Sequence, residues 1–264
     1  MAESNGLPEV TAIRFATPLE WLAGGWRDLW RAPFSFLAYG LVVATICGVT
    51  VTGLALTGMG LWSLVLAAGF AFLAPMIAMG VYEGGRLIEE GQRPSLFRIA
   101  FVGQAFRRDV VFLGLALLIV FGIWAELARV TYGIATSRLY ETLDEFLTFA
   151  LATGTGNVML IWGTVVGGIL AWLTYSFVVI SAPMLLDRNA DIFVATVTSV
   201  RCVVKNTGPM LLWAAIIAGM LLLSAATFFV GLVIVIPWLG LASWRAYRCL
   251  VATPDHAPRD DQSA

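Results

Sequence analysis

Long apolar runs dominate this chain and restrict what it can fold into. Six of them occur, at about residues 36–56, 61–82, 110–127, 158–186, 210–229 and 231–250. About 20 apolar residues in a helix span the ~30 Å hydrocarbon layer of a bilayer. Only 12% of the residues are charged, against about 25% in soluble domains. The sequence therefore predicts an all-α fold, a polytopic membrane helix bundle with six transmembrane helices in a lipid bilayer.

One membrane domain, residues 17–252, contains all six runs. The polar segments on either side, residues 1–16 and 253–264, are predicted to be disordered, and the first lacks the charged start and apolar core of a signal peptide. The fifth and sixth runs have no polar loop between them. One long kinked helix from Pro209 to Leu250 is the alternative there, but it would be about 63 Å long, about twice the membrane thickness.

Short amphipathic helices are expected between the spans. In the first, Thr17 is the N-cap and Glu20 is placed to close a capping box. A second is expected to open at Ser95, and a third is capped by Asp191. A further surface-lying helix is predicted within residues 130–156.

The first amphipathic helix has two distinct faces. An apolar stripe is formed by Leu19, Leu22, Trp26 and Leu29, whereas the charged residues lie away from it: Glu20, Arg27, Asp28 and Arg31. Trp21 and Trp30 add aromatic rings of the kind found at the headgroup level of a membrane. Further tryptophans are expected near membrane interfaces or span ends: Trp62, Trp162, Trp213, Trp238 and Trp244.

Basic residues gather on one side of the predicted bundle. Of the 16 Lys and Arg residues, 14 fall on one side if there are six spans, and only Arg129 and Arg138 fall on the other. Short loops rich in Lys and Arg stay in the cytoplasm. Both termini and the three basic amphipathic helices are therefore predicted to be cytoplasmic.

A unit of interfacial helix, span and proline-bent span is a candidate threefold repeat. Its three prolines stand near the cytoplasmic ends of the second, fourth and sixth runs, at Pro75, Pro183 and Pro237. A proline removes one backbone hydrogen bond and bends the helix, and inside a membrane the freed carbonyl needs another partner. The alternative to a true repeat is chance in a chain rich in Ala, Leu and Val.

Charged residues follow two of these prolines. Glu83 and Arg86 lie one helical turn apart at the end of the second run, and Arg245 and Arg248 do so in the sixth. One interpretation is anchoring at the cytoplasmic surface with local pairing. The other is that these side chains interlock with the amphipathic helices into a cytoplasmic collar.

Glu126 is the one carboxylate within a predicted span. Ionisable residues inside membranes are candidates for function. Glu126 stands near the outer end of its span, three residues before Arg129. An ion pair at the helix end is therefore the simpler interpretation, and a substrate or proton site is the alternative.

Three stretches carry a family resemblance: Pro18–Pro33, Gly69–Gly91 and Gly231–Leu250. Together with their spacing they resemble a bacterial integral membrane family, domain of unknown function 2189, over about residues 15–252. The resemblance implies a multi-pass protein of the bacterial inner (plasma) membrane with no assigned activity. Some members of that family are labelled as cytochrome c oxidase subunits.

Motifs for chemistry are missing from the sequence. Oxidase cores need several buried histidine ligands, and the one histidine here, His256, lies in the polar tail. No G-x-S-x-G sequence occurs, and the Cys residues are scattered: Cys47, Cys202 and Cys249. We therefore expect no metal, no haem or other cofactor and no enzymatic activity. The net charge of −1 does not favour nucleic acid as a partner.

Two functions from different classes fit this reading. The first is a non-enzymatic protein that binds or organises other membrane proteins, such as an assembly or envelope factor. The second is a small transporter or channel with a site between the proline-bent spans, where transporter sites often lie. An intramembrane enzyme is the third and weakest. A continuous polar cavity would favour transport, and a sealed bundle would favour the first function.

Overall fold

The structure is a computed structural model that describes residues 7–57, 62–136, 140 and 143–251. Within these residues the chain is helical, and its elements are α1 (Thr17–Leu29), α2 (Pro33–Leu56), α3 (Trp62–Ile77), α4 (Met79–Glu89), α5 (Leu96–Ala100), the 3-10 helix η1 (Gly103–Phe106), α6 (Arg108–Ala135), α7 (Leu143–Ala152), α8 (Gly154–Val178), α9 (Ser181–Asp187), α10 (Ile192–Lys205), α11 (Thr207–Ala226) and α12 (Leu232–Leu250).

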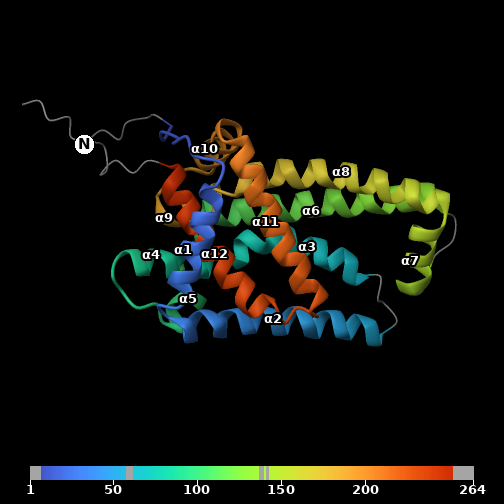
Figure 1. Ribbon diagram of the computed structural model, residues 1–264, viewed down its shortest axis with the longest axis horizontal. Helices are drawn as coiled ribbons and strands as arrows, with labels where there is room; N and C mark the ends of the chain where they lie inside the picture. The colour runs from blue at the N-terminus through green and yellow to red at the C-terminus, as the bar shows by residue number, and fades with distance from the viewer. Residues whose placement is uncertain (1–6, 58–61, 137–139, 141–142, 252–264) are drawn as a thin grey trace, which may run out of the picture.

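The long helices define one axis of the molecule. In Figure 1, α2, α6 and α8 run roughly along the long axis, and α1 crosses that direction steeply. The short helices α4, α5, α9 and α10 gather with α1 at one end. Val10 pairs with Val251 at this end, so the two ends of the described chain lie together.

Four helical segments in the described part of the chain are long and apolar enough to cross a membrane: Pro33–Leu56, Arg108–Ala135, Gly154–Asp187 and Thr207–Ala226. They correspond to the first, third, fourth and fifth predicted spans, and they confirm multiple membrane helices. α3 and α12 do not meet the same criteria. α3 ends soon after its proline, and the last turns of α12 carry Arg245 and Arg248. The count of six spans stays a prediction.

Two of the predicted apolar runs have an internal break, and the fifth and sixth runs form separate helices. The run at residues 61–82 is divided between α3 and α4 around Ala78, and the run at 158–186 is divided between α8 and α9. The stretch from Pro209 to Leu250 forms two helices, α11 and α12. Phe228 and Phe229 turn the chain between them with positive φ angles of 50° and 66°.

The start of α1 differs from the expectation. Thr17 is the first helical residue and Ala16 is the N-cap, with no side-chain cap. Glu20 instead forms an ion pair with Arg14 at 2.9 Å. The predicted capping box is therefore wrong, because the helix begins one residue earlier than such a cap would require and Glu20 has a different partner.

The buried face of α1 was also predicted wrongly. Trp21, Gly24, Gly25 and Asp28 are buried, whereas the Leu19 side chain is exposed. The two glycines permit close contact with α12, because an added Cβ on Gly25 would lie 2.7 Å from a backbone nitrogen of α12. The helix therefore packs through its small residues and Leu29, and only part of the predicted stripe, Leu19 and Trp26, faces outward.

The chain before α1 is held in place from Val10 onward, although it was expected to be disordered up to residue 16. Val10 is buried, and its carbonyl accepts a hydrogen bond from Lys205 at 2.7 Å. The Asn206 side chain binds the backbone at Ile13 and Thr11. Other expectations fall outside the described residues: the ends at 1–6 and 253–264, the turn at 58–60, Arg138 and His256.

Two of the predicted helix starts are confirmed. Ser95 caps α5 by accepting a hydrogen bond from the backbone nitrogen of Arg98. Asp191 caps α10 by accepting one from Phe193 at 2.7 Å. The predicted surface-lying segment contains α7, which ends directly before Thr153, the N-cap of α8.

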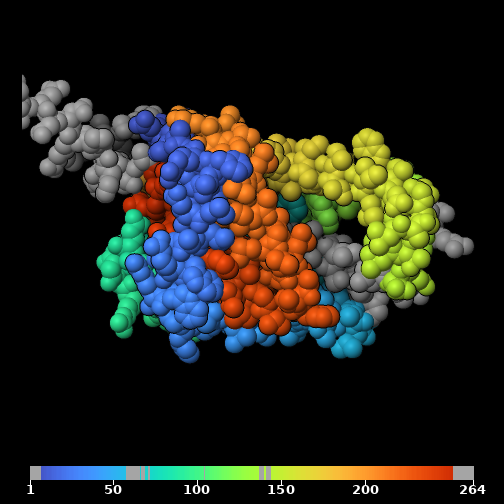
Figure 2. Space-filling view, viewed as in Figure 1, coloured from blue at the N-terminus to red at the C-terminus, as the bar shows by residue number. Residues whose placement is uncertain are grey.

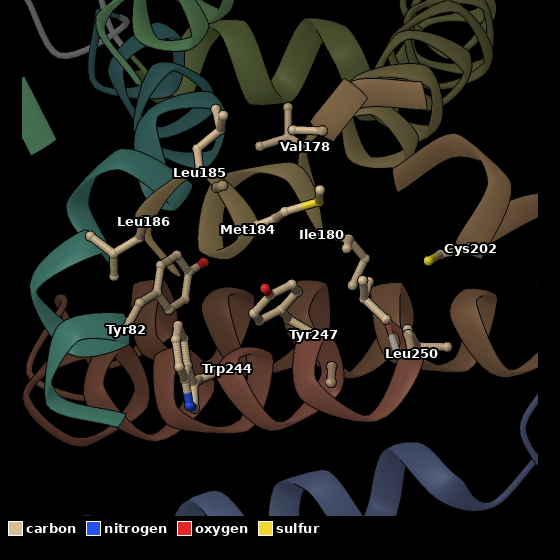
Figure 3. Packing of buried hydrophobic residues seen from close by; sticks show 14 of the residues in the cluster. Tyr82, Val178, Ile180, Met184, Leu185, Leu186, Cys202, Trp244, Tyr247 and Leu250 are labelled. Carbon is tan, nitrogen blue, oxygen red and sulfur yellow. The ribbon is translucent and has the colours of Figure 1, made fainter. Parts of the chain in front are cut away.

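A large apolar cluster at the gathered end joins α4, α9, α10 and α12. Figure 3 shows Tyr82 from α4 and Tyr247 from α12 in this cluster, with Met184 of α9 above them. Trp21 and Trp213 meet edge to face at 5.8 Å, and both are buried. They therefore hold α1 against α11, and their expected place at the headgroup level stays a prediction.

Candidate functional site

Each proline near a helix break has a different local partner. At the end of α3, two residues after Pro75, the carbonyl of Ile77 accepts a hydrogen bond from the Tyr39 hydroxyl of α2. A neighbouring helix thus supplies the bond that an interrupted helix needs inside a membrane. The bend at Pro75 is therefore part of the α2–α3 contact.

The break between α8 and α9 is bridged by a serine. Pro183 follows the break, and its ring disfavours a helical carbonyl four residues earlier, at Val179. The Ser199 hydroxyl of α10 accepts from the Ile180 N–H at 3.2 Å and donates to the Ser176 carbonyl at 2.8 Å. In an unbroken helix these two backbone groups would bond to each other, so the serine side chain occupies the gap.

At Pro237 the helix continues. The carbonyl four residues earlier belongs to Val233, in the first turn of α12. This oxygen points at α2, because a Cβ added to Gly40 would lie 2.1 Å from it. The local geometry therefore differs at the three prolines, and the threefold repeat stays a prediction.

Glu83 and Arg86 form an ion pair at the gathered end of the molecule. Their side chains are 2.7 Å apart, and Arg86 also binds Glu90. Glu83 is buried and Arg86 is only partly exposed. The hydrogen bond that Arg86 donates to Glu83 raises the pKa of Arg86 above its ordinary value, so the guanidinium stays charged.

Arg245 reaches across to α1. Its guanidinium forms an ion pair with Asp28, which also lies 3.6 Å from Arg31. The Asp28 side chain is only 7% exposed. The structure thus gives this buried carboxylate two arginine partners, one from its own helix and one from the C-terminal helix.

Arg248 joins α12 to two further helices. It lies 2.9 Å from Glu89 of α4 and 3.4 Å from Asp187 of α9. Asp187 also accepts a hydrogen bond from the Tyr247 hydroxyl at 2.6 Å. With Glu83, Arg86, Asp28 and Arg245 these residues surround the end of α12, and we call the set the ion-pair collar.

Glu126 lies apart from the collar. It pairs with Arg129 at 2.8 Å on α6, and both side chains are exposed, at 66% and 74%. Neither residue lines a cavity in the described part of the chain.

A cavity of about 640 Å³ lies inside the bundle, bounded by α3, α4, α6, α8, α11 and α12. Figure 2 shows the surface hollowed between α11 and α8. Pro75 and Ile236, the neighbour of Pro237, both line it. The cavity therefore lies between proline-containing helices, where the sequence analysis expects a site for its second function.

Small residues on two helices create this space. α8 contributes Gly168 and Ala171, and α11 contributes Ala215. Small residues usually let membrane helices approach closely, but α8 and α11 are not among the closely packed helix pairs. Their clear link is the Tyr175 hydroxyl, which donates to the Met210 carbonyl at 2.9 Å. The small side chains therefore face empty space.

The polar groups of the cavity wall are few. Thr174 and Tyr175 donate their hydroxyl protons to backbone carbonyls. Ser243 of α12 and Tyr82 of α4 also line the cavity. Tyr82 directly precedes Glu83 of the collar, and Ser243 stands two residues before Arg245. No charged side chain lines the cavity among the described residues.

Sequence patterns did not identify several of these residues. Asp28 and Ser199 act through partners far along the chain, at separations of 217 and 23 residues. Tyr82 and Ser243 look like ordinary hydroxyls at span ends. The one available signal was the small-residue spacing of α8 and α11, which also fits close helix packing.

Comparison with known families agrees with the resemblance seen in the sequence. Residues 63–187 match a family model described as predicted integral membrane protein, domain of unknown function 2189. No curated protein and no solved structure matches the chain. The matched segment extends from α3 to α9 and contains Pro75, Pro183 and the Glu83–Arg86 pair. Over residues 63–187, which is just under half of the chain, this protein is similar to the DUF2189 family of predicted integral membrane proteins.

Proposed function

We propose that this protein is a non-enzymatic, multi-pass membrane protein that binds a lipid-class ligand in the cavity between its bent helices. The cavity is the observation that carries this proposal. Its volume of about 640 Å³ falls in the range of ligand sites, about 300–1,000 Å³. Protein interiors are otherwise close-packed, so an apolar space of this size calls for an occupant.

The lining chemistry supports a lipid. Among the described residues the wall is formed by aliphatic and aromatic side chains with a few hydroxyls. Bilayer hydrocarbon surrounds the long helices, and the surface is hollowed between α11 and α8 (Figure 2). A ligand could therefore enter sideways from the bilayer.

Transport is the second candidate, and one observation favours it. The cavity adjoins Pro75 and Pro237, and transporter sites commonly lie at broken helices. Such sites for ions or polar solutes carry charged or strongly polar groups, whereas the polar groups of this wall are hydroxyls. The same cavity also fits a protein that binds a lipid and organises other membrane proteins.

The proposed location is the bacterial inner membrane with both termini in the cytoplasm. Two observations support this orientation. The ends of the described chain meet at Val10 and Val251, which requires an even number of crossings. The arginines and acidic partners of the collar gather at that same end, as expected for a cytoplasmic face.

The test compares two tryptophan substitutions on α8. Gly168→Trp puts a large side chain into the cavity, where an added Cβ meets nothing within 4 Å. Gly163→Trp is the control, because Gly163 is exposed on the same helix and does not line the cavity. After purification in mild detergent, native mass spectrometry should find bound lipid in wild type and Gly163→Trp and little in Gly168→Trp. Equal lipid content in all three would contradict the proposal.

A further inference from the structure

The polar groups of the cavity are grouped at one end. Tyr82 and Ser243 both line the cavity, and both are largely buried. They come from α4 and α12, the two helices that continue into the ion-pair collar. The end of the cavity nearest the collar is therefore its hydrogen-bonding end.

This hydroxyl pair has bonding capacity to spare. Each hydroxyl has one proton and two acceptor lone pairs. Within the described part of the chain, neither hydroxyl takes part in a hydrogen bond with another protein group. Their protons and lone pairs can therefore serve a ligand oxygen.

Charges close to this end are already engaged. Glu83 follows Tyr82 in sequence but binds Arg86 at 2.7 Å. Arg245, two residues after Ser243, binds Asp28. No charged side chain lines the cavity in the part of the chain that the structure describes. A charged headgroup in the cavity would lose its water without gaining a counter-ion.

From these contacts we infer that the cavity takes an uncharged lipid of the surrounding bilayer. Its hydroxyl or carbonyl oxygens hydrogen-bond with Tyr82 and Ser243, and its hydrocarbon chain lies along the small residues of α8 and α11. This inference rests on the proposed function and adds the ligand class and the ligand's orientation. Diacylglycerol represents the class, and phosphatidic acid with the same chains is the matched charged lipid.

The experiment uses the full-length protein in nanodiscs containing one of these two lipids as a probe. Each probe carries a diazirine on the same carbon of one acyl chain. After illumination, mass spectrometry locates the labelled peptides. Diacylglycerol should label the cavity-lining segments of α8 and α11 at least tenfold more than phosphatidic acid at equal mole fraction.

Substitutions locate the polar end. Ser243→Ala and Tyr82→Phe each remove one hydroxyl, and each should lower diacylglycerol labelling of the cavity several-fold. Thr174→Ala is the matched control, because its hydroxyl lines the cavity but is bonded to the Leu170 carbonyl of its own helix. Thermal unfolding of each variant identifies any that fail to fold. If Tyr82→Phe does not fold, Ser243→Ala still tests the polar end of the cavity independently.

The outcomes separate the inference from the proposed function. Equal labelling of the cavity by both probes would overturn the uncharged class while leaving lipid binding in place. Unchanged labelling in Ser243→Ala and Tyr82→Phe would overturn the assigned polar end. If neither probe labels the cavity, or if α8 and α11 crosslink to a second copy of the chain instead, both the inference and the proposed function fail.

Discussion

At the scale of single residues, Gly40 decides how closely α2 can approach α12. A Cβ at this position would lie 2.1 Å from the Val233 carbonyl oxygen, and a backbone atom cannot move aside cheaply. We expect Gly40→Ala to destabilise the protein by about 1–3 kcal/mol, as overpacking does. Scanning fluorimetry in detergent would measure the change.

Gly48 is the matched control for that substitution. It lies two turns further along α2, and a Cβ there would meet nothing within 4 Å. Gly48→Ala should leave stability unchanged or raise it, since alanine favours a helix over glycine by roughly 1 kcal/mol. If Gly40→Ala and Gly48→Ala destabilised the protein equally, the Val233 carbonyl would not be what limits how closely α2 approaches α12.

The pairing of Asp28 with Arg245 gives a second prediction. Removing the arginine leaves a buried carboxylate with only the more distant Arg31. Breaking a buried ion pair costs about 3–5 kcal/mol. Because Arg245 is 38% exposed, screening lowers the expected loss for Arg245→Gln to about 2 kcal/mol.

The exposed Glu126–Arg129 pair provides the comparison. Arg129→Gln should cost at most about 1 kcal/mol, as surface pairs do. Adding Asp28→Asn to Arg245→Gln should recover part of the lost stability, because the uncompensated charge is then gone. A double-mutant cycle from thermal unfolding measures this, and purely additive losses would argue against the pairing.

Thiol reactivity is a third prediction at this scale. Burial raises the pKa of Cys202 to about 12, so at pH 8 about one thiol in 10⁴ is ionised. Cys249 is exposed. In folded protein, iodoacetamide should modify Cys249 and spare Cys202, since the thiolate is the reactive form.

The pH dependence has a definite sign. Each added pH unit below 12 should raise the thiolate fraction of Cys202 about tenfold, and unfolding in SDS should remove the protection. Peptide mass spectrometry follows both cysteines in one sample. Rapid modification of Cys202 at pH 8 in the folded protein would be inconsistent with its burial.

At the scale of elements, Ser199 joins two helices that a proline separates. In Ser199→Ala, the Ile180 N–H and the Ser176 carbonyl lose the hydroxyl that links them. Leaving buried polar groups unpaired costs about 1–3 kcal/mol. Hydrogen exchange should show faster opening at the α8–α9 break, because local opening reports the stability of that segment.

Ser224→Ala is the control for this element. Ser224 is also buried, but its hydroxyl bonds to the Met220 carbonyl within its own helix. The backbone of α11 is continuous there, so the loss should be smaller and confined to α11. Equal exchange at Ile180 in wild type and Ser199→Ala would contradict the bridging role.

Helix identity and helix contacts differ in how far the sequence could predict them. The apolar runs predicted α2, α6, α8 and α11, because a bilayer demands long apolar helices whatever their neighbours are. Asp191 and Ser95 predicted helix starts, because capping is local. The inward side of Asp28 was missed, since its partner Arg245 is 217 residues away. The cavity was missed because small residues serve close packing and open space equally well.

At the scale of the whole molecule, the ion-pair collar and the cavity are consecutive along the same helices. α4 carries Tyr82 and then Glu83 and Arg86, and α12 carries Ser243 and then Arg245. The uncharged residues face the cavity and the charged ones pair outside it. We therefore propose that the change from uncharged to paired charge lies at the membrane boundary of the gathered end.

The orientation of the molecule follows from that boundary and gives the last prediction. In a background with all three native cysteines replaced by alanine, Arg27→Cys and Arg129→Cys place single exposed thiols at opposite ends of the bundle. A membrane-impermeant maleimide should label position 129 on intact bacterial cells and position 27 only after the cells are lysed. The reason is that most arginines lie at the end of the bundle that contains α1, and we expect that end to be cytoplasmic. The reverse labelling pattern would invert the proposed topology. Labelling of both positions on intact cells would place positions 27 and 129 on the same side of the membrane and refute the proposal that α6 spans it.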